Sequence, residues 1–142
     1  MSEELNPVRI YDSHYRGACT SERGEQISCM EWLRIYAPDR FDLIFHCPNE
    51  TKGNIQHGDM RRRQGVKSGV PDIFDARGTR HWRSGMFELK RLDKSKSAIS
   101  KQQMDFLAAG AESGSFCAIC YGAEEFKKAY LDFLSLSPLQ SP

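Results

Sequence analysis

Two acidic residues and one lysine in the middle of the chain have the types and spacing needed for hydrolytic chemistry. Glu88 and Lys90 are separated by one apolar residue, Leu89, and Asp72 lies earlier in the same stretch, directly after a proline. In a β-strand, alternate side chains point to the same face, so Glu88 and Lys90 share one face while Phe87 and Leu89 occupy the other. The spacing therefore predicts an acid and an amine side by side.

Two short apolar runs contain these residues and are expected to pair. Residues 70–74 and 86–89 are bounded by Gly, Pro, Arg and Ser, and a glycine-bearing connection over 78–85 joins them, which is typical of neighbouring strands. Pairing brings Asp72 beside Glu88 and Lys90 at one end of a small sheet. Two carboxylates held together in a poorly solvated site cannot both stay ionised. A hard divalent cation such as Mg²⁺, which binds one or two carboxylates together with waters and phosphate oxygens, would remove the difficulty.

Positive charge is concentrated around this stretch. The chain of 142 residues has a net charge of +1, but residues 52–101 contain 13 Lys and Arg against 5 Asp and Glu, which leaves 7 against 14 elsewhere. Such a region suits a polyanionic substrate, although a solvated charged surface gives the same pattern. The candidate nucleic-acid contacts are Arg61, Arg62, Arg63, Lys67 and Arg91. The first three end an expected short helix over residues 54–64, where arginines also complement the helix dipole.

Size and composition indicate one globular domain. A chain of this length can bury its own core, and 39% hydrophobic with 27% charged residues are ordinary values. No apolar run approaches the roughly 20 residues that span a bilayer, and the first residues lack the apolar centre of a signal peptide, so we expect a cytoplasmic protein. Cys117 and Cys120 have the spacing of zinc ligands, but they lie in an expected strand over 116–121 and would face opposite ways.

A helix is expected to begin after Ser21 and to bring a further acid to the site. Ser21 can cap it, and apolar residues recur after it at spacings of three and four. Glu22 lies one turn before Gln26 on an apolar stripe that we expect to face inward. Glu25 is the alternative because it lies on a second helical stripe, and an acid in the first turn is also favoured by the helix dipole alone.

The remaining chain alternates between strands and helices. We expect a strand over 42–47, a helix begun by a capping box of Ser100 and Gln103, a strand over 116–121 that is covered on both faces, and an amphipathic helix over 123–134. This order predicts an α/β fold in which helices flank a mixed sheet within residues 21–134. Residues 1–20 are expected to be an irregular arm, and residues 135–142 a disordered tail.

Several blocks of the sequence, in order, resemble one nuclease family. Asp72 after a proline, followed by Glu88-Leu89-Lys90, is similar to the motif of the PD-(D/E)XK nucleases. GVKSGVPDIF, MFELK, ISKQQMDFL and FCAICYGAEEF resemble the VRR-NUC family of virus-type replication and repair nucleases, over roughly residues 21–134. The resemblance implies a restriction-endonuclease-like core. The chain departs from the family at Glu50, where a glycine is common, so Asn49 and Glu50 are given no role.

The resemblance also implies roles for individual residues. The implied ligands of Mg²⁺ or Mn²⁺ are Glu22, Asp72, Glu88 and the backbone carbonyl of Leu89. Lys90 would position or activate the attacking water. Gln26 and Gln103 would support the site; the family has an acid four positions before a glutamine, which Glu22 and Gln26 match. Two roles stay open for Gln103. It can cap the helix, or it can orient a water molecule or a phosphate, and the sequence favours neither.

The implied activity is that of a metal-dependent DNA endonuclease, selective for Holliday junctions, flaps or other branched DNA and used in DNA repair. Because stand-alone members of the family can be homodimers, we expect a homodimer that presents two sites, in a bacterial or phage-infected cytoplasm. Two alternatives stay open. One is a non-catalytic nucleic-acid-binding module whose acids are paired with arginines, and the other is a nuclease for single-stranded DNA or RNA.

Overall fold

In the computed structural model, which describes residues 6–48 and 55–138, the chain forms a mixed sheet of five strands. The strand order is β1-β5-β4-β3-β2. The strands are β1 (Arg9–Tyr11), β2 (Ile44–His46), β3 (Ile73–Asp75), β4 (Gly85–Lys90) and β5 (Phe116–Tyr121). β4 is central and pairs antiparallel with β3 and parallel with β5. The expected antiparallel pairing of the two motif strands is therefore confirmed.

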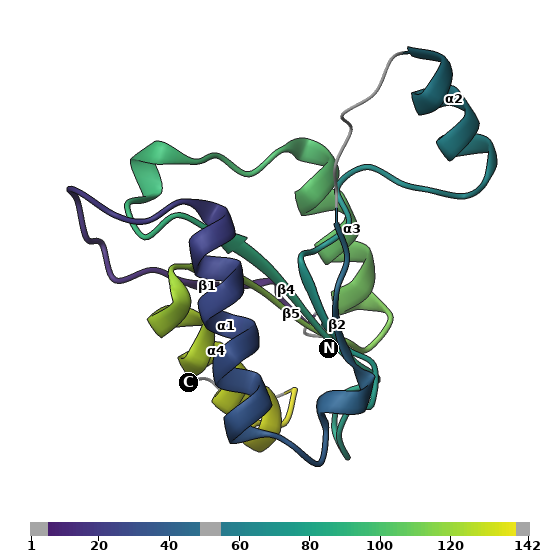
Figure 1. The fold of residues 1–142 in the computed structure, drawn as a ribbon. Coiled ribbons are helices and arrows are strands. Elements are labelled where there is room, and N and C mark those ends of the chain that lie inside the picture. Colours follow the sequence, from purple (N-terminus) through teal and green to yellow (C-terminus); the bar gives the residue numbers. More distant parts are fainter. Residues whose placement is uncertain (1–5, 49–54, 139–142) are drawn as a thin grey trace, which may run out of the picture.

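Helices cover both faces of this sheet (Figure 1). Helices α1 (Glu22–Tyr36) and α4 (Ala123–Ser135) pack together on one face, and α3 (Lys101–Glu112) packs on the other. The remaining helix, α2 (Ile55–Arg63), stands away from the sheet in Figure 1. The α/β architecture expected from the order of elements is confirmed. No helix in residues 6–48 and 55–138 is long and apolar enough to cross a membrane.

The main core lies between β4 and the helix pair α1 and α4. Phe87 on β4 is fully buried and meets Phe126 and Phe133 of α4 edge-on, at ring-centroid distances of 5.1 and 5.8 Å. Leu89 is buried in the same cluster. Since each buried aromatic or aliphatic side chain contributes about 1.5–3 kcal/mol, this packing holds β4 firmly. The opposite face of β4, which carries Glu88 and Lys90, is thereby fixed in orientation.

Both faces of β5 are buried, as its apolar run predicted. Cys117 packs in the smaller cluster under α3, whereas Cys120 packs in the main core on the other side of the sheet. The two thiols therefore lie on opposite faces of the sheet, as the strand period predicted.

Asp75, three residues after Asp72, has a structural role. Asp75 is fully buried and accepts hydrogen bonds from the Arg40 guanidinium at 3.0–3.1 Å and from the Tyr130 hydroxyl at 2.8 Å. These contacts join β3 to α4 and to the short 3₁₀ turn Phe41–Leu43 that precedes β2. Part of the strand expected over 42–47 is this turn, and β2 itself is shorter. Burial and pairing with arginine distinguish Asp75 from Asp72.

The N-terminal arm is more ordered than expected. Residues 9–11 form the edge strand β1, parallel to β5, so the expectation of an irregular arm was wrong there. Three residues are too few to show a strand period, and β1 is held by its pairing with β5 rather than by local pattern. The Gly17 N–H donates to Asp93 (2.9 Å), and the Arg91 guanidinium donates to the carbonyls of Cys19 and Thr20. These contacts fix the residues that directly precede α1.

The C-terminal boundary also differs from the expected one. Ser135 still belongs to α4, and the Leu136 carbonyl accepts a hydrogen bond from the Trp82 indole at 2.8 Å. The expected disordered tail therefore includes at least two residues that belong to the fold. Residues 139–142, like Asn49 and Glu50, lie outside the described residues.

Candidate active site

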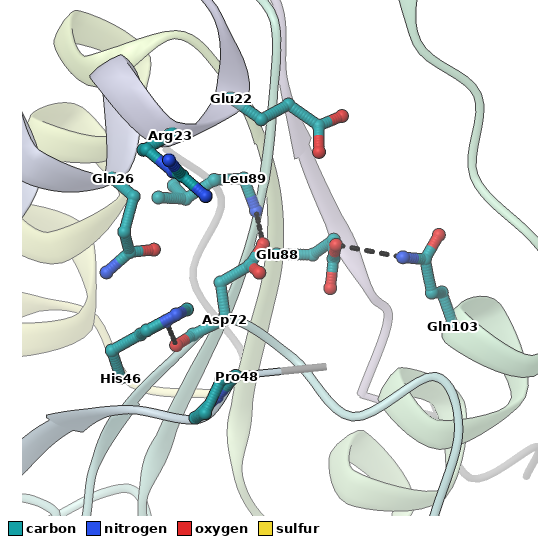
Figure 2. A pocket seen from close by; sticks show the side chains of 9 residues that line it. All are labelled: Glu22, Arg23, Gln26, His46, Pro48, Asp72, Glu88, Leu89 and Gln103. Atoms are coloured by element: carbon teal, nitrogen blue, oxygen red, sulfur yellow. Dashed lines mark hydrogen bonds between the residues drawn. The ribbon is translucent and has the colours of Figure 1, made fainter. Parts of the chain in front are cut away.

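The sequence-predicted acids and lysine meet at one end of β3 and β4. Asp72 directly precedes β3, and the register that pairs Ile73 with Phe87 brings it beside Glu88. Figure 2 shows the two side chains next to each other, with the Asp72 carboxyl group at the Leu89 N–H and the Glu88 carboxyl group at the Gln103 amide. They line a pocket of about 330 Å³ to which α1, α3 and the end of β2 also contribute. The convergence expected from strand spacing is present in the structure.

Glu88 is buried, and Lys90 compensates its negative charge only in part. Its side chain is 4% exposed, and burial raises its pKa to about 9, with further upward contributions from the charge of Asp72 and a hydrogen bond with Asp72. Lys90 acts in the opposite direction but does not cancel these effects. The Oε2 atom of Glu88 is buried without a hydrogen-bond partner among the described residues. This carboxyl group needs either a proton or a cation.

The Lys90 ammonium lies between two acids without a close bond to either. Its side chain is 6% exposed, and Nζ is 3.8 Å from Glu88 Oε1 and 3.9 Å from Glu22 Oε1. Both distances are too long for hydrogen bonds. Lys90 therefore reduces the local negative charge while its N–H groups stay able to donate to a substrate.

The backbone of Leu89 faces the same site. Its N–H donates to Asp72 Oδ2 at 2.7 Å, which orients that carboxylate. In an antiparallel pair the N–H and C=O of one residue point to the same neighbouring strand. Extending the register of β3 and β4 places Pro71 opposite Leu89, and proline has no N–H to donate. The Leu89 carbonyl is thus left without its ladder donor from β3, which suits the role of a ligand.

The two helix acids occupy different positions in the structure. Glu22 lines the pocket and its side chain is 47% exposed. Glu25 is 7% exposed and accepts a hydrogen bond from the Ala123 N–H at the start of α4. Its carboxylate therefore caps α4 and takes no part in the pocket. The expectation that the stripe of Glu22 faces inward was wrong: the buried stripe of α1 is Glu25, Cys29 and Leu33, because α1 packs on α4 as well as on the sheet.

Gln103 combines the two roles that the sequence left open. Its Oε1 accepts from the Ser100 N–H at 2.9 Å, and the Ser100 hydroxyl accepts from the Gln103 N–H at 3.1 Å, so the capping box is formed. Its Nε2 donates to Glu88 Oε1 at 3.0 Å (Figure 2). The helix cap therefore holds the amide in place, and the amide holds the buried carboxyl group. Gln26 also lines the pocket, as expected.

Replacement of Gln103 by Glu should separate these two roles. Glutamate at this position also completes a capping box, so Gln103→Glu should fold and melt within a few degrees of the wild type. The variant loses the N–H donor to Glu88 and adds a negative charge to the pocket, so the nuclease activity that the resemblance implies should fall at least about tenfold, since misplaced catalytic groups commonly cost this much or more. Thermal melts and cleavage rates measure the two effects. Equal activity would show that the Gln103–Glu88 bond has no role.

The pocket fits a divalent cation with fewer carboxylates than expected. Within residues 6–48 and 55–138, no three His, Cys, Asp or Glu side chains are arranged to hold a metal ion. The expected set of three acids is therefore not formed, and Glu22 lies beside Lys90 instead. Asp72, Glu88 and the Leu89 carbonyl match the partial protein shell that Mg²⁺ typically completes with water and phosphate. A cation would also satisfy Glu88 Oε2, so the residues present fit the ion.

Sequence reasoning missed three residues that line the pocket, Arg23, His46 and Pro48. His46 Nδ1 lies 2.7 Å from the Asp72 carbonyl oxygen. A carbonyl oxygen can only accept, so His46 Nδ1 is the donor of this hydrogen bond. The position of His46 at the end of an expected strand, just before a Pro-Asn pair, is the signal that could have identified it. Nothing in the local sequence distinguishes Arg23 from other residues of the first helical turn.

None of the five basic residues proposed as nucleic-acid contacts lines the carboxylate pocket. Arg61, Arg62 and Arg63 lie on α2, away from the sheet (Figure 1). Arg62 and Lys67 line a second pocket of about 550 Å³ against α3. Arg91 is used to hold the N-terminal arm. Contacts between these residues and phosphates stay predictions.

The mixed sheet, the flanking helices and the carboxylates at the junction of β3 and β4 match an α/β fold of the PD-(D/E)XK type. Among solved structures the chain is similar to a VRR_NUC domain protein, with a TM-score of 0.69 and 19% sequence identity, over 82% of this chain and 89% of that chain. No family model and no curated protein matches the sequence. The chain has the VRR_NUC fold, and the resemblance seen in the sequence is confirmed at that level.

Proposed function

We propose that this chain is a nuclease of the VRR-NUC family that hydrolyses DNA phosphodiester bonds with the help of Mg²⁺ or Mn²⁺. The observation that carries the proposal is the adjacent pair of half-buried Asp72 and buried Glu88, in which Glu88 Oε2 has no hydrogen-bond partner among the described residues and the Lys90 ammonium lies 3.8 Å from Glu88 Oε1. The fold supports it, because a VRR_NUC domain protein has the same architecture.

Different residues of the site would bind the cation, position the carboxylates and donate to the substrate. Asp72, Glu88 and the Leu89 carbonyl would hold the cation, which when bound lowers the pKa of water and offsets charge on the scissile phosphate. The Leu89 N–H and the Gln103 amide keep the two carboxylates in position before substrate arrives. Lys90 would donate to the attacking water or to a phosphate oxygen where negative charge increases. Preorganised donors of this kind usually supply most of the rate enhancement.

One observation weighs against the non-catalytic binding module. That alternative requires the acids to be structural partners of arginines. Among the described residues, Glu88 has an ion pair with Lys90 only and Asp72 has none, whereas the arginine-paired acid of this stretch is Asp75. Two adjacent carboxylates without an arginine, one of them buried, cost stability, which suits a functional site better than a structural one.

A cleavage panel tests the proposal. Holliday junction, flap, duplex, single-stranded DNA and RNA are incubated with Mg²⁺, Mn²⁺ or EDTA. We expect metal-dependent cutting of DNA that is fastest on branched substrates. Faster cutting of single-stranded DNA or RNA would show that one of these, rather than branched DNA, is the preferred substrate. Salt-sensitive binding without metal and without products would support the binding module instead.

We also propose that the protein acts as a homodimer. Branched DNA presents two equivalent strands, and a twofold assembly would place one pocket at each. Light scattering at micromolar concentration should give twice the mass of 16.2 kDa. A monomer under these conditions would contradict the dimer while leaving the nuclease proposal intact.

A further inference from the structure

The carboxylate pocket has an unbalanced set of charges. Three acids line it, Glu22, Asp72 and Glu88, and among the described lining residues the basic ones are Arg23 and His46. Lys90 is near but is almost fully buried between two of the acids. A polyanionic strand that enters this pocket therefore meets one accessible permanent cation, the Arg23 guanidinium.

Arg23 is positioned to be available. It lies in the first turn of α1, directly after Glu22, and its side chain is exposed. In the part of the chain that the structure describes, its guanidinium forms no hydrogen bond or ion pair, although three carboxylates line the same pocket. A guanidinium offers five donors in a planar fork that matches phosphate oxygens. Its donors are therefore free for a ligand.

Gln26, one helical turn further on, supplies an independent observation. Its Oε1 and Nε2 are both buried and have no hydrogen-bond partner among residues 6–48 and 55–138. Buried polar groups without partners are rare, and each one calls for a missing partner such as an ion, water or ligand. In Figure 2, Arg23 and Gln26 lie on one side of the Asp72–Glu88 pair, whereas Glu22 and Gln103 lie on the other. Lys90 belongs to the side of Glu22.

We propose that Arg23, with the Gln26 amide beside it, forms a subsite for a phosphate that flanks the scissile one on the substrate strand. The inference rests on the proposed nuclease function and deepens it. The scissile phosphate lies over the carboxylate pair on the side of Lys90, and the next phosphate along the strand meets the guanidinium. Arg23 is therefore a substrate-binding residue that offsets the repulsion between the acids and the DNA backbone.

Replacement of Arg23 should weaken binding more than it slows the chemical step. Arg23→Ala should raise KM about tenfold or more with a smaller change in kcat, since the lost contact is made before and during the reaction. Arg23→Lys should recover part of the loss, because an ammonium retains the charge but not the fork. The slope of log Kd against log salt should fall by about 0.9 for duplex DNA, as expected when one phosphate contact is lost.

Arg80→Ala is the matched control. It removes the same charge from an exposed arginine in the connection between β3 and β4, at the far end of both strands from the pocket. Both variants should melt like the wild type, since neither guanidinium forms a hydrogen bond or ion pair in the described chain. Only Arg23→Ala should change KM.

Replacement of single DNA phosphates by uncharged methylphosphonates identifies the phosphate that Arg23 contacts. Single methylphosphonates are placed along a duplex that the wild type cuts, and Kd is measured with Ca²⁺ in place of Mg²⁺. We expect one position flanking the cut at which neutralisation weakens wild-type binding about tenfold but does not weaken Arg23→Ala further. Identical profiles for the two proteins would overturn the subsite. A wild type that cuts none of the substrates would instead refute the nuclease function, so the two failures are distinguishable.

Discussion

Asp72→Asn and Glu88→Gln should each lower cleavage at least about 10³-fold, because each removes one of two acidic groups that we propose hold the cation and the developing charge. The amide variants keep the contacts that shape the site. Asn at position 72 can still accept from the Leu89 N–H, and Gln at position 88 can still accept from the Gln103 amide. The loss should therefore report on charge rather than on folding.

The measurement is single-turnover cleavage of the best substrate from the panel, with saturating Mg²⁺ or Mn²⁺. Glu112→Gln, an exposed acid in the last turn of α3, is the control with the same change in charge. It should cut at the wild-type rate. Cleavage by folded Asp72→Asn or Glu88→Gln within about tenfold of the wild type would remove these residues from the active site.

Glu88→Gln should have a second large effect, an increase in the stability of the metal-free protein. The pKa of Glu88 rises from 4.5 to about 9 on folding, chiefly because of burial and then because of Asp72. Because the folded state holds the Glu88 proton more tightly than the unfolded state does, protonated Glu88 favours folding. This contribution to the free energy of unfolding is complete below pH 4.5 and is lost progressively up to about pH 9. Gln does not titrate and retains both a donor and an acceptor, so it avoids this loss.

We therefore expect metal-free Glu88→Gln to exceed the wild type by at least about 1 kcal/mol in the free energy of unfolding at pH 8. The difference should shrink toward pH 5. Added Mg²⁺ should raise the melting temperature of the wild type by ligand linkage and have little effect on the variant. A variant that melts below the wild type at pH 8 in EDTA would show that Glu88 is not destabilising in its charged form.

These two expectations have one physical origin. A site that must bind a cation and a phosphate keeps acidic groups close together, and in the absence of the ligand their repulsion and desolvation lower the stability of the fold. The aromatic packing of Phe87 against α4 offsets that cost elsewhere in the sheet. Loss of function and gain of stability at position 88 should therefore occur together.

Much of the site could be predicted from local sequence. The alternation of side chains in a strand decided that Glu88 and Lys90 share one face and that Phe87 and Leu89 enter the core. The capping box of Ser100 and Gln103, the cap at Ser21 and the fully buried strand β5 were also predicted correctly. These features depend on the alternation of side chains along a strand and on contacts between residues a few positions apart. Both can be predicted from the local sequence.

Other features were decided only by packing between distant segments. The strand β1 exists because β5 offers an edge, and Glu25 turned inward because α4 begins next to it. Arg23 reaches the pocket because α1 lies across the end of β4, and no local pattern marks it. The spacing of residues along the chain thus determined which groups share a face. Only the tertiary structure decided which faces meet, because that depends on how helices and strands far apart in sequence pack on one core.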